Sequence, residues 1–171
     1  MSNLQPTISL ATPEHLPAIT DLITQAYTPY IPRLNGKKPA PMTADYSALI
    51  DSSCLYILSA SAPSSTSASN PTPSSTPPTV LGCVSLELDA KSEALEINNL
   101  AISPSSQGKG YGKLLMKFAE DVAAEKGLKK LELYTNVKMV ENLALYQKLG
   151  YREVGRWAED GFERVFFVKE V

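Results

Sequence analysis

Apolar and polar residues alternate along the middle of the chain. In VLGCVSLELD, residues 80–89, the side chains change character at every position from Val84 to Asp89. This period of two is typical of a β-strand that buries one face. We therefore expect a strand here, with its polar side turned away from the core.

A second alternating stretch, ALEINNLAIS, changes face halfway along. Its apolar positions are first Leu95 and Ile97, and then Leu100 and Ile102. A strand can keep its apolar side chains on one face only if the backbone takes up an extra residue where the parity slips. The pattern predicts a bulge or a sharp twist at Asn98–Asn99.

Apolar residues recur at helical spacing in two further stretches. Between residues 109 and 126 they form one stripe, which ends at Gly127, and Leu16, Ile19 and Ile23 follow the same spacing earlier. Shorter patterns predict strands at 7–11, 54–59, 128–135, 151–157 and 162–169, and helices at 42–52 and from an Asn136 cap to Gly150. This order predicts an α/β (α+β) fold, a mixed sheet with helices on its faces.

One segment of the chain has almost no apolar side chains. Residues 59–79 contain only Ser, Thr, Pro and Ala apart from Asn70. Such a segment cannot bury enough apolar surface to offset its chain entropy. We expect a disordered connection at about 60–79 between two strands of a single domain, 1–171. A neutral insertion is favoured over a segment regulated by phosphorylation.

Composition excludes several functions. The 171 residues carry a net charge of −2, so no basic field recruits nucleic acid. No apolar run is long enough to span a bilayer, and the N-terminus has no secretory pattern. We expect a cytoplasmic protein without nucleic-acid or membrane partners.

Cysteine and histidine are scarce. Cys54 and Cys83 lie in apolar, strand-like runs, and His15 is the single histidine. The two cysteines are expected to be buried thiols, and a disulfide between neighbouring strands is the alternative. With one histidine and no cysteine cluster, no metal site is expected.

Three glycines stand within five positions where the strand at 94–103 ends. The segment QGKGYG, residues 107–112, then leads directly into the helical stripe. Positions without side chains let backbone N–H groups converge on an anion, and the free donors and dipole of a helix N-terminus add to this attraction. The corner therefore predicts an anion-binding site, and a tight turn without a ligand is the alternative.

Two familiar phosphate-binding motifs do not match this corner. Leu114 stands where a nucleotide-hydrolase P-loop needs a hydroxyl, and Gln107 stands where it needs its first glycine. Lys113 stands where the dinucleotide fingerprint needs its third glycine. The anion is therefore bound in another way.

The glycine corner resembles the acetyl-CoA-binding motif of the GNAT N-acetyltransferases, Q/R-x-x-G-x-G/A, at Gln107, Gly110 and Gly112. The order of elements also resembles this family over most of residues 7–169. The resemblance implies a mostly antiparallel sheet of six to seven strands, about four helices and a bulged fourth strand that splays from its neighbour. It also implies acetyl-CoA as co-substrate, held by Leu100, Ala101, Ile102, Gln107, Gly108, Lys109, Gly110, Tyr111, Gly112, Lys113, Asn136, Asn142 and Tyr146.

The resemblance also suggests the catalytic groups. Asn142 and Tyr146 are four residues apart, hence on one helix face. In the family, the two corresponding positions carry a cofactor contact and the acid that protonates the CoA sulfur. Without this resemblance, Tyr146 would be interpreted as a core residue. Glu96 matches a glutamate that some histone-acetylating members use as the base. Glu87 or a chain of waters is the alternative.

Two loops flank the acceptor site in this family. By that resemblance, the candidate acceptor contacts are Asn98 with Tyr27, Tyr30, Arg33, Asp45, Trp157, Glu159 and Asp160. The expected activity is direct transfer of acetyl to a primary amine of a small molecule, such as an amino sugar, a polyamine or an amino-acid derivative. A protein N-terminus or lysine is the alternative acceptor, and a catalytically silent CoA-binding module is the alternative of another class. Members of the family are often dimeric, so a homodimer is a further expectation.

Overall fold

The computed structural model describes residues 5–60 and 78–171. Most of the connection predicted at about 60–79 lies outside the described residues. The strands are β1 (Pro6–Leu10), β2 (Leu55–Ala60), β3 (Thr79–Asp89), β4 (Ala94–Ile102), β5 (Lys130–Asn136), β6 (Arg152–Glu159) and β7 (Phe162–Glu170). The α-helices are α1 (Leu16–Tyr27), α2 (Tyr46–Asp51), α3 (Tyr111–Glu125) and α4 (Val140–Lys148).

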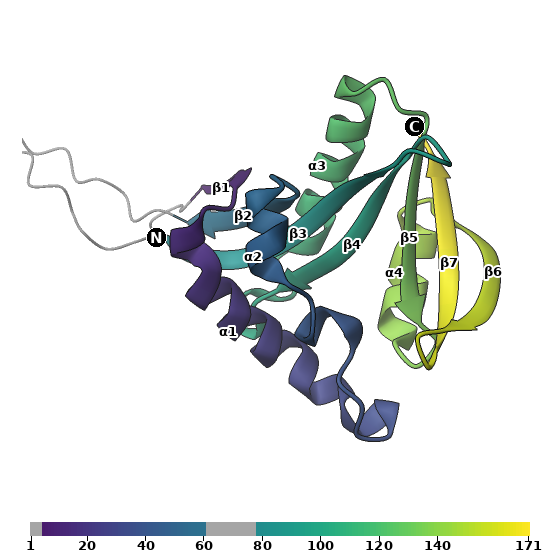
Figure 1. The fold of residues 1–171 in the computed structure, drawn as a ribbon, viewed down its shortest axis with the longest axis horizontal. Helices are drawn as coiled ribbons and strands as arrows, with labels where there is room; N and C mark the ends of the chain where they lie inside the picture. The colour runs from purple at the N-terminus through teal and green to yellow at the C-terminus, as the bar shows by residue number, and fades with distance from the viewer. Residues whose placement is uncertain (1–4, 61–77) are drawn as a thin grey trace, which may run out of the picture.

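The strands form one mixed sheet in the order β1-β2-β3-β4-β5-β7-β6 (Figure 1). Every neighbouring pair is antiparallel except β4 and β5, which run parallel. The chain crosses from β4 to β5 through α3, as a parallel pair requires. The predicted α/β architecture, with seven strands and four helices, is confirmed.

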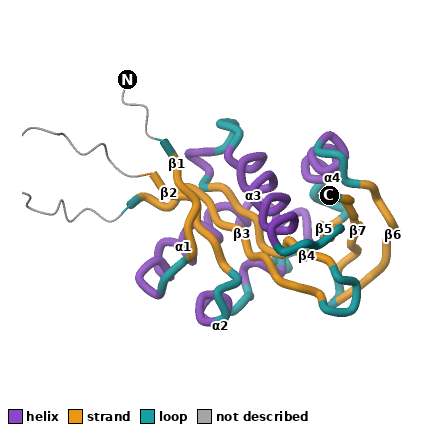
Figure 2. Tube along the Cα trace, turned by 90° about the horizontal axis from the view of Figure 1, so that it is seen from above, coloured by secondary structure: helices purple, strands orange, loops and turns teal. Residues whose placement is uncertain are grey.

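Helices cover the two faces of the sheet unequally (Figure 2). One core places α3 and α4 against alternate side chains of β3, β4, β5 and β7, among them Leu95, Leu131 and Phe167. The other core places α1 and α2 against β2, β3 and β4, through residues such as Ile19 and Ile57. In the described part of the chain, the face of β5, β7 and β6 that lies opposite α4 carries no α-helix.

The predicted bulge in β4 is present. Val84 on β3 pairs with Leu100, whereas Leu86, two residues on, pairs with Ile97. Two β4 residues, Asn98 and Asn99, therefore stand opposite Ser85 alone. The hydroxyl of Ser85 accepts a hydrogen bond of 2.9 Å from the N–H of Asn99, which satisfies an amide that the ladder leaves over.

Beyond the bulge, β4 separates from β5. Their pairing runs from Ala94 and Lys130 to Ile97 and Leu133 and stops there. Figure 1 shows the two strands diverging from this point. The sheet thus has an opening between β4 and β5, at the same end as the glycine corner.

The start of α4 corrects one expectation. Asn136 was predicted to cap this helix, but α4 begins at Val140. The side chain of Asn136 instead accepts a bond of 2.9 Å from the N–H of Lys138, and its own carbonyl accepts one from Met139. An asparagine that bonds to the backbone two residues on forms a local turn, and this turn competes with a helix cap.

Both cysteines are free, so the alternative of a disulfide is wrong. Cys83 is buried and Cys54 is partly buried. Burial raises the pKa of the Cys83 thiol to about 12, which leaves it protonated at neutral pH. Among the described residues, no helix combines the length and hydrophobicity that crossing a membrane would require.

Candidate functional site

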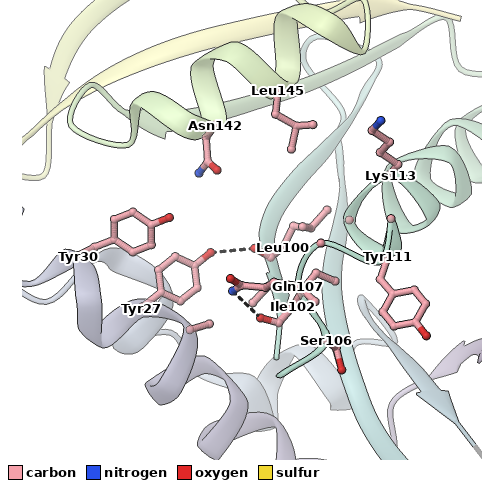
Figure 3. A pocket seen from close by; sticks show the side chains of 15 residues that line it. Tyr27, Tyr30, Leu100, Ile102, Ser106, Gln107, Tyr111, Lys113, Asn142 and Leu145 are labelled. Carbon is pink, nitrogen blue, oxygen red and sulfur yellow. Dashed lines mark hydrogen bonds between the residues drawn. The ribbon is translucent and has the colours of Figure 1, made fainter. Parts of the chain in front are cut away.

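A groove of about 440 Å³ lies where the opening of the sheet meets the start of α3 (Figure 3). We call it the glycine groove. Asn142 and Leu145 on α4 face Tyr27 and Tyr30 across it. Its lining comprises Ala26, Tyr27, Tyr30, Leu100, Ala101, Ile102, Ser106, Gln107, Gly108, Gly110, Tyr111, Gly112, Lys113, Asn142 and Leu145.

The glycines of the corner have two different roles. Gly108 and Gly110 adopt positive φ angles of +78° and +83°, which glycine reaches without strain. Gly112 lies in the first turn of α3 with ordinary helical geometry, and a Cβ there would meet only Ile102, at 4.0 Å. Crowding therefore explains none of the three. The first two shape the turn, and the third keeps the helix N-terminus open.

Backbone donors gather at this corner. Within residues 5–60 and 78–171, no acceptor bonds the N–H groups of residues 108–113, and the first helical bond of α3 runs from Leu114 to the carbonyl of Gly110. Six consecutive amides at a helix N-terminus form a site for an anion. The side chain of Lys113 lines the same groove and adds positive charge.

The exposed edge of β4 presents donors. The N–H of Ser103 bonds to the carbonyl of Leu81 on β3, so by alternation the polar groups of Leu100 and Ile102 point toward the opening. Their carbonyls are occupied: the Tyr27 hydroxyl donates to Leu100 at 2.9 Å, and the Gln107 amide donates to Ile102 at 3.2 Å. The N–H groups of these two residues remain turned toward the opening.

Tyr146 lies on α4 beside a smaller space. Its ring packs edge-on against Tyr151 and Phe167, at centroid distances of 6.1 and 5.6 Å. Burial raises the pKa of Tyr146 to about 12, with a smaller contribution from Tyr30. The hydroxyl therefore keeps its proton at neutral pH, as a proton donor must.

The smaller space, which we call the inner cavity, has a volume of about 60 Å³. It adjoins the glycine groove, because Tyr27, Leu100 and Asn142 line both. The Asn142 amide donates to the Thr135 hydroxyl at 3.3 Å, which fixes its orientation between the two spaces. The rest of the lining comprises Leu34, Pro39, Ala40, Pro41, Asn98, Asn99, Tyr134, Thr135, Asn136, Met139, Tyr146, Phe162 and Arg164.

Glu96 faces a third space, beside the part of the sheet formed by β5, β7 and β6, on the face opposite α4. This sheet-face cavity has a volume of about 310 Å³ and shares Asn98 and Tyr134 with the inner cavity. Burial is the largest cause that raises the pKa of Glu96, and three neighbouring carboxylates raise it further, those of Asp89, Glu132 and Glu87. A carboxylate with a raised pKa is a stronger base than an ordinary glutamate.

The structure brings most of the predicted cofactor residues together at one groove. Ten line the glycine groove: Leu100, Ala101, Ile102, Gln107, Gly108, Gly110, Tyr111, Gly112, Lys113 and Asn142. Lys109 is exposed and lines none of the three spaces, whereas Asn136 and Tyr146 line the inner cavity.

The predicted acceptor residues are more dispersed. Tyr27 and Tyr30 line the glycine groove, and Trp157 lines the sheet-face cavity. Asp45 instead caps α2, where its carboxylate accepts from the N–H of Ala48 at 3.0 Å. Arg33 crosses to α4 and donates to both carboxylate oxygens of Glu141, at 2.7 and 2.9 Å.

The sequence analysis missed Arg164, although it lies beside Glu159 and Asp160, two of the predicted acceptor contacts. Its side chain is 6% exposed, lies over the Tyr134 ring at 4.2 Å, and pairs with Glu159 and, at 3.3 Å, with Asp160. It also lines the inner cavity. The sequence did carry an indication of this, because Arg164 is the single charged residue in the apolar run RVFFV. A charged side chain is rarely buried unless it is paired.

A family model supports this picture. Residues 38–151 match the model described as "Acetyltransferase (GNAT) family". A "Probable N-acetyltransferase 14" from Xenopus tropicalis is 33% identical over 78 residues, which cover 46% of this chain and 38% of that protein. An "IAA acetyltransferase" from Azospirillum brasilense is 31% identical over 83 residues, 48% of this chain and 54% of that protein. The chain thus spans about half or less of the length of the curated relatives it matches.

Solved structures share the fold. An acetyltransferase of the GNAT family from Listeria monocytogenes superposes with a TM-score of 0.72 at 13% identity and covers 99% of this chain and 97% of its own. The PaiA N-acetyltransferase from Thermoplasma acidophilum, solved in complex with coenzyme A, gives a TM-score of 0.71 at 17% identity, with coverage of 98% and 99%.

Proposed function

The chain belongs to the GNAT acetyltransferase family, and on this premise we propose that it is an acetyl-CoA-dependent N-acetyltransferase of small primary amines. One observation carries the proposal. The six amides of residues 108–113 are free of partners in the described part of the chain, and all of these residues except Lys109 line a groove of about 440 Å³. A groove of this size suits an extended ligand with an anionic end.

The residues present fit coenzyme A. The free amides and the dipole of α3 would hold its diphosphate, and Lys113 would add attraction. The N–H groups of Leu100 and Ile102 would bond to carbonyl oxygens of its arm. When bound, acetyl-CoA supplies an acetyl group activated as a thioester.

Two side chains would move the protons. Tyr146 holds a protonated hydroxyl beside the inner cavity and would donate to the leaving sulfur. Glu96 would take the proton of the acceptor amine, which is charged at neutral pH unless a base removes its proton. Asn98 and Tyr134 line both the inner cavity, which Tyr146 lines, and the sheet-face cavity, which Glu96 lines, and would connect these two groups.

Two further expectations belong to the proposal. The free cysteines support a reducing compartment, such as the cytoplasm. A homodimer is expected from the family resemblance, and light scattering in solution would test it.

Calorimetry with coenzyme A tests the cofactor site. We expect saturable one-to-one binding by the wild type, and binding weakened about tenfold or more by Gly112→Asp, which would place a carboxylate against the diphosphate. Asp is favourable in the first turn of a helix, so this variant should fold. Unaltered affinity would place the diphosphate elsewhere.

Release of free thiol from acetyl-CoA across a library of amines, amino sugars and peptides tests the reaction. Turnover of small amines supports the proposal. Turnover of peptides alone would replace it with protein acetylation, and binding without turnover of any amine would indicate a silent CoA-binding module.

A further inference from the structure

The sheet-face cavity has walls unlike those of the glycine groove. It lies on the face of β5, β7 and β6 opposite α4, a face that carries no α-helix among the described residues (Figure 2). The lining comprises Glu96, Asn98, Glu132, Leu133, Tyr134, Val154, Trp157, Phe166, Phe167 and Val168. A concave, mostly apolar space with a few polar groups is the usual form of a small-molecule site.

An aromatic wall bounds this cavity. The Trp157 ring stacks on the Phe166 ring at a centroid distance of 3.7 Å and an interplanar angle of 8°. Gly155 makes this position possible, because a Cβ there would lie 2.5 Å from the Trp157 ring. Trp157 is nevertheless 49% exposed, so the ring is fixed on one side and open to solvent on the other. A tryptophan face held in this way is suited to a cation.

The acidic wall is formed by strand register. Glu87 stands directly opposite Glu96 across β3 and β4, and Glu96 stands directly opposite Glu132 across β4 and β5. Carboxylate oxygens of Glu96, Glu132 and Asp89 lie within 4.8 Å of one another. Like charges directly opposite each other destabilise a sheet, so this row is costly for the empty protein.

Local partners offset only part of this charge. The Asn98 amide donates to Glu87 at 3.0 Å. The Ser92 hydroxyl lies 2.7 Å from Asp89 and 3.3 Å from Glu132, and its single proton can be donated to only one of them at a time. Lys130 reaches Glu132 only at 3.9 Å, and Arg152 stands at the end of the same row on β6. Lys91 adds a third cation, beside Asp89, and the nearby Arg164 is already paired with Glu159 and Asp160. Four carboxylates thus face three free cations on this surface of the described chain, and the excess favours a positively charged occupant.

We propose that the sheet-face cavity binds a second cationic group of the acceptor, so that linear diamines and related amines with a remote ammonium are the preferred substrates. Glu132 and the open face of Trp157 would hold the remote ammonium, while the reacting amine enters the inner cavity past Asn98 and Tyr134. The inference rests on the proposed acetyltransferase function, because it names the substrate class of that site.

Binding is measured without catalysis, because Trp157 is the single tryptophan of the chain. Its fluorescence is followed during titration with linear α,ω-diamines and with monoamines of the same length. We expect a saturable change with diamines, tighter than any response to monoamines by about tenfold or more, and weakened about tenfold in Glu132→Gln. Glu125→Gln, an equal change of charge at the exposed end of α3, should leave the titration unchanged.

Selectivity is measured as the ratio of kcat/KM for a diamine to kcat/KM for the matching monoamine. We expect a ratio of about ten or more in the wild type and in Glu125→Gln, and a ratio near one in Glu132→Gln and Trp157→Leu.

A wild-type ratio near one overturns the inference and leaves the acetyltransferase proposal intact. Diamine binding with no turnover of any amine would overturn the proposed acetyltransferase function and leave the cation site intact. Displacement of the diamine by millimolar Mg²⁺ alone would make the row a metal site and overturn the inference.

Discussion

The glycine groove and the sheet-face cavity are made from different parts of the chain. The groove takes its donors from the backbone of residues 108–113 and from one strand edge, whereas the cavity takes its charges and rings from side chains on four strands. A backbone N–H group is kept when the side chain of its residue is replaced, unless the new residue is proline. A site made of side chains changes with every substitution in it. On the proposed function, the first region would hold the cofactor that every acetyl transfer needs, and the second would select the acceptor.

Tyr146 lies between these regions, and its loss should have the largest effect. Tyr146→Phe is expected to lower kcat by roughly 10²–10⁴ while KM for acetyl-CoA changes little, since only the proton donor is removed. Stopped-flow thiol release measures it. Tyr151→Phe is the matched control: it removes a buried hydroxyl that has no hydrogen-bond partner in the described structure, and kcat should stay near that of the wild type. Equal loss in both variants would remove Tyr146 from the mechanism.

Glu96→Gln should lower kcat/KM by about 10², near the lower end of the range for a lost base. The pKa of Glu96 is raised, so kcat/KM of the wild type should fall as the pH drops through that raised pKa. The Gln variant should lack this acidic limb. A pH profile that keeps the limb in the variant would assign the base to another group.

The same variant should be more stable at neutral pH. Because folding raises the pKa of Glu96, the folded protein binds its proton more tightly than the unfolded chain, and stability falls as the pH rises through the raised pKa. Glutamine cannot ionise, so Tm should rise at about pH 7.5 and change little at about pH 4. A lower Tm at neutral pH would mean that the ionised carboxylate stabilises the fold.

Two glycines of the backbone-built region should respond in opposite directions. Gly110→Ala forces a side chain into a left-handed conformation and should cost about 1–2 kcal/mol of unfolding free energy. Gly112→Ala occupies an open helical position and should gain up to about 1 kcal/mol. Urea unfolding measures both. The same sign for both would mean that the corner is not shaped by φ.

The smallest effect is expected at the link between the α1–α2 loop and α4. The Arg33–Glu141 pair is about half exposed on both sides, so Arg33→Ala should cost less than about 1 kcal/mol. Thermal unfolding at low and high salt measures it, and most of the difference should disappear at high salt. A larger loss would show that the loop and α4 are coupled through more than this pair.

Local pattern was enough to predict much of this fold. The parity slip in β4 predicted the bulge, because a shift of one residue in a strand with one buried face would turn its apolar side chains toward the opposite face. The glycine corner was equally local. Asn136 was assigned wrongly as a helix cap because a turn and a cap use the same side chain in the same way.

The acidic and aromatic walls of the sheet-face cavity could not be predicted in the same way. Glu87, Glu96 and Glu132 become neighbours only through the register of three strands, and β5 is separated from β4 by a whole helix. The Trp157–Phe166 stack depends on a bulge in β6 between Glu153 and Gly155. Alternation assigns a face to each residue but does not show which residue stands opposite.

The two blocked carbonyls of β4 have one more consequence. An open strand edge invites another polypeptide to add to the sheet, and such addition needs acceptors as well as donors. With Tyr27 and Gln107 bonded to Leu100 and Ile102, the edge offers N–H groups alone. It can therefore stay open for a carbonyl-bearing ligand and still resist aggregation by strand addition.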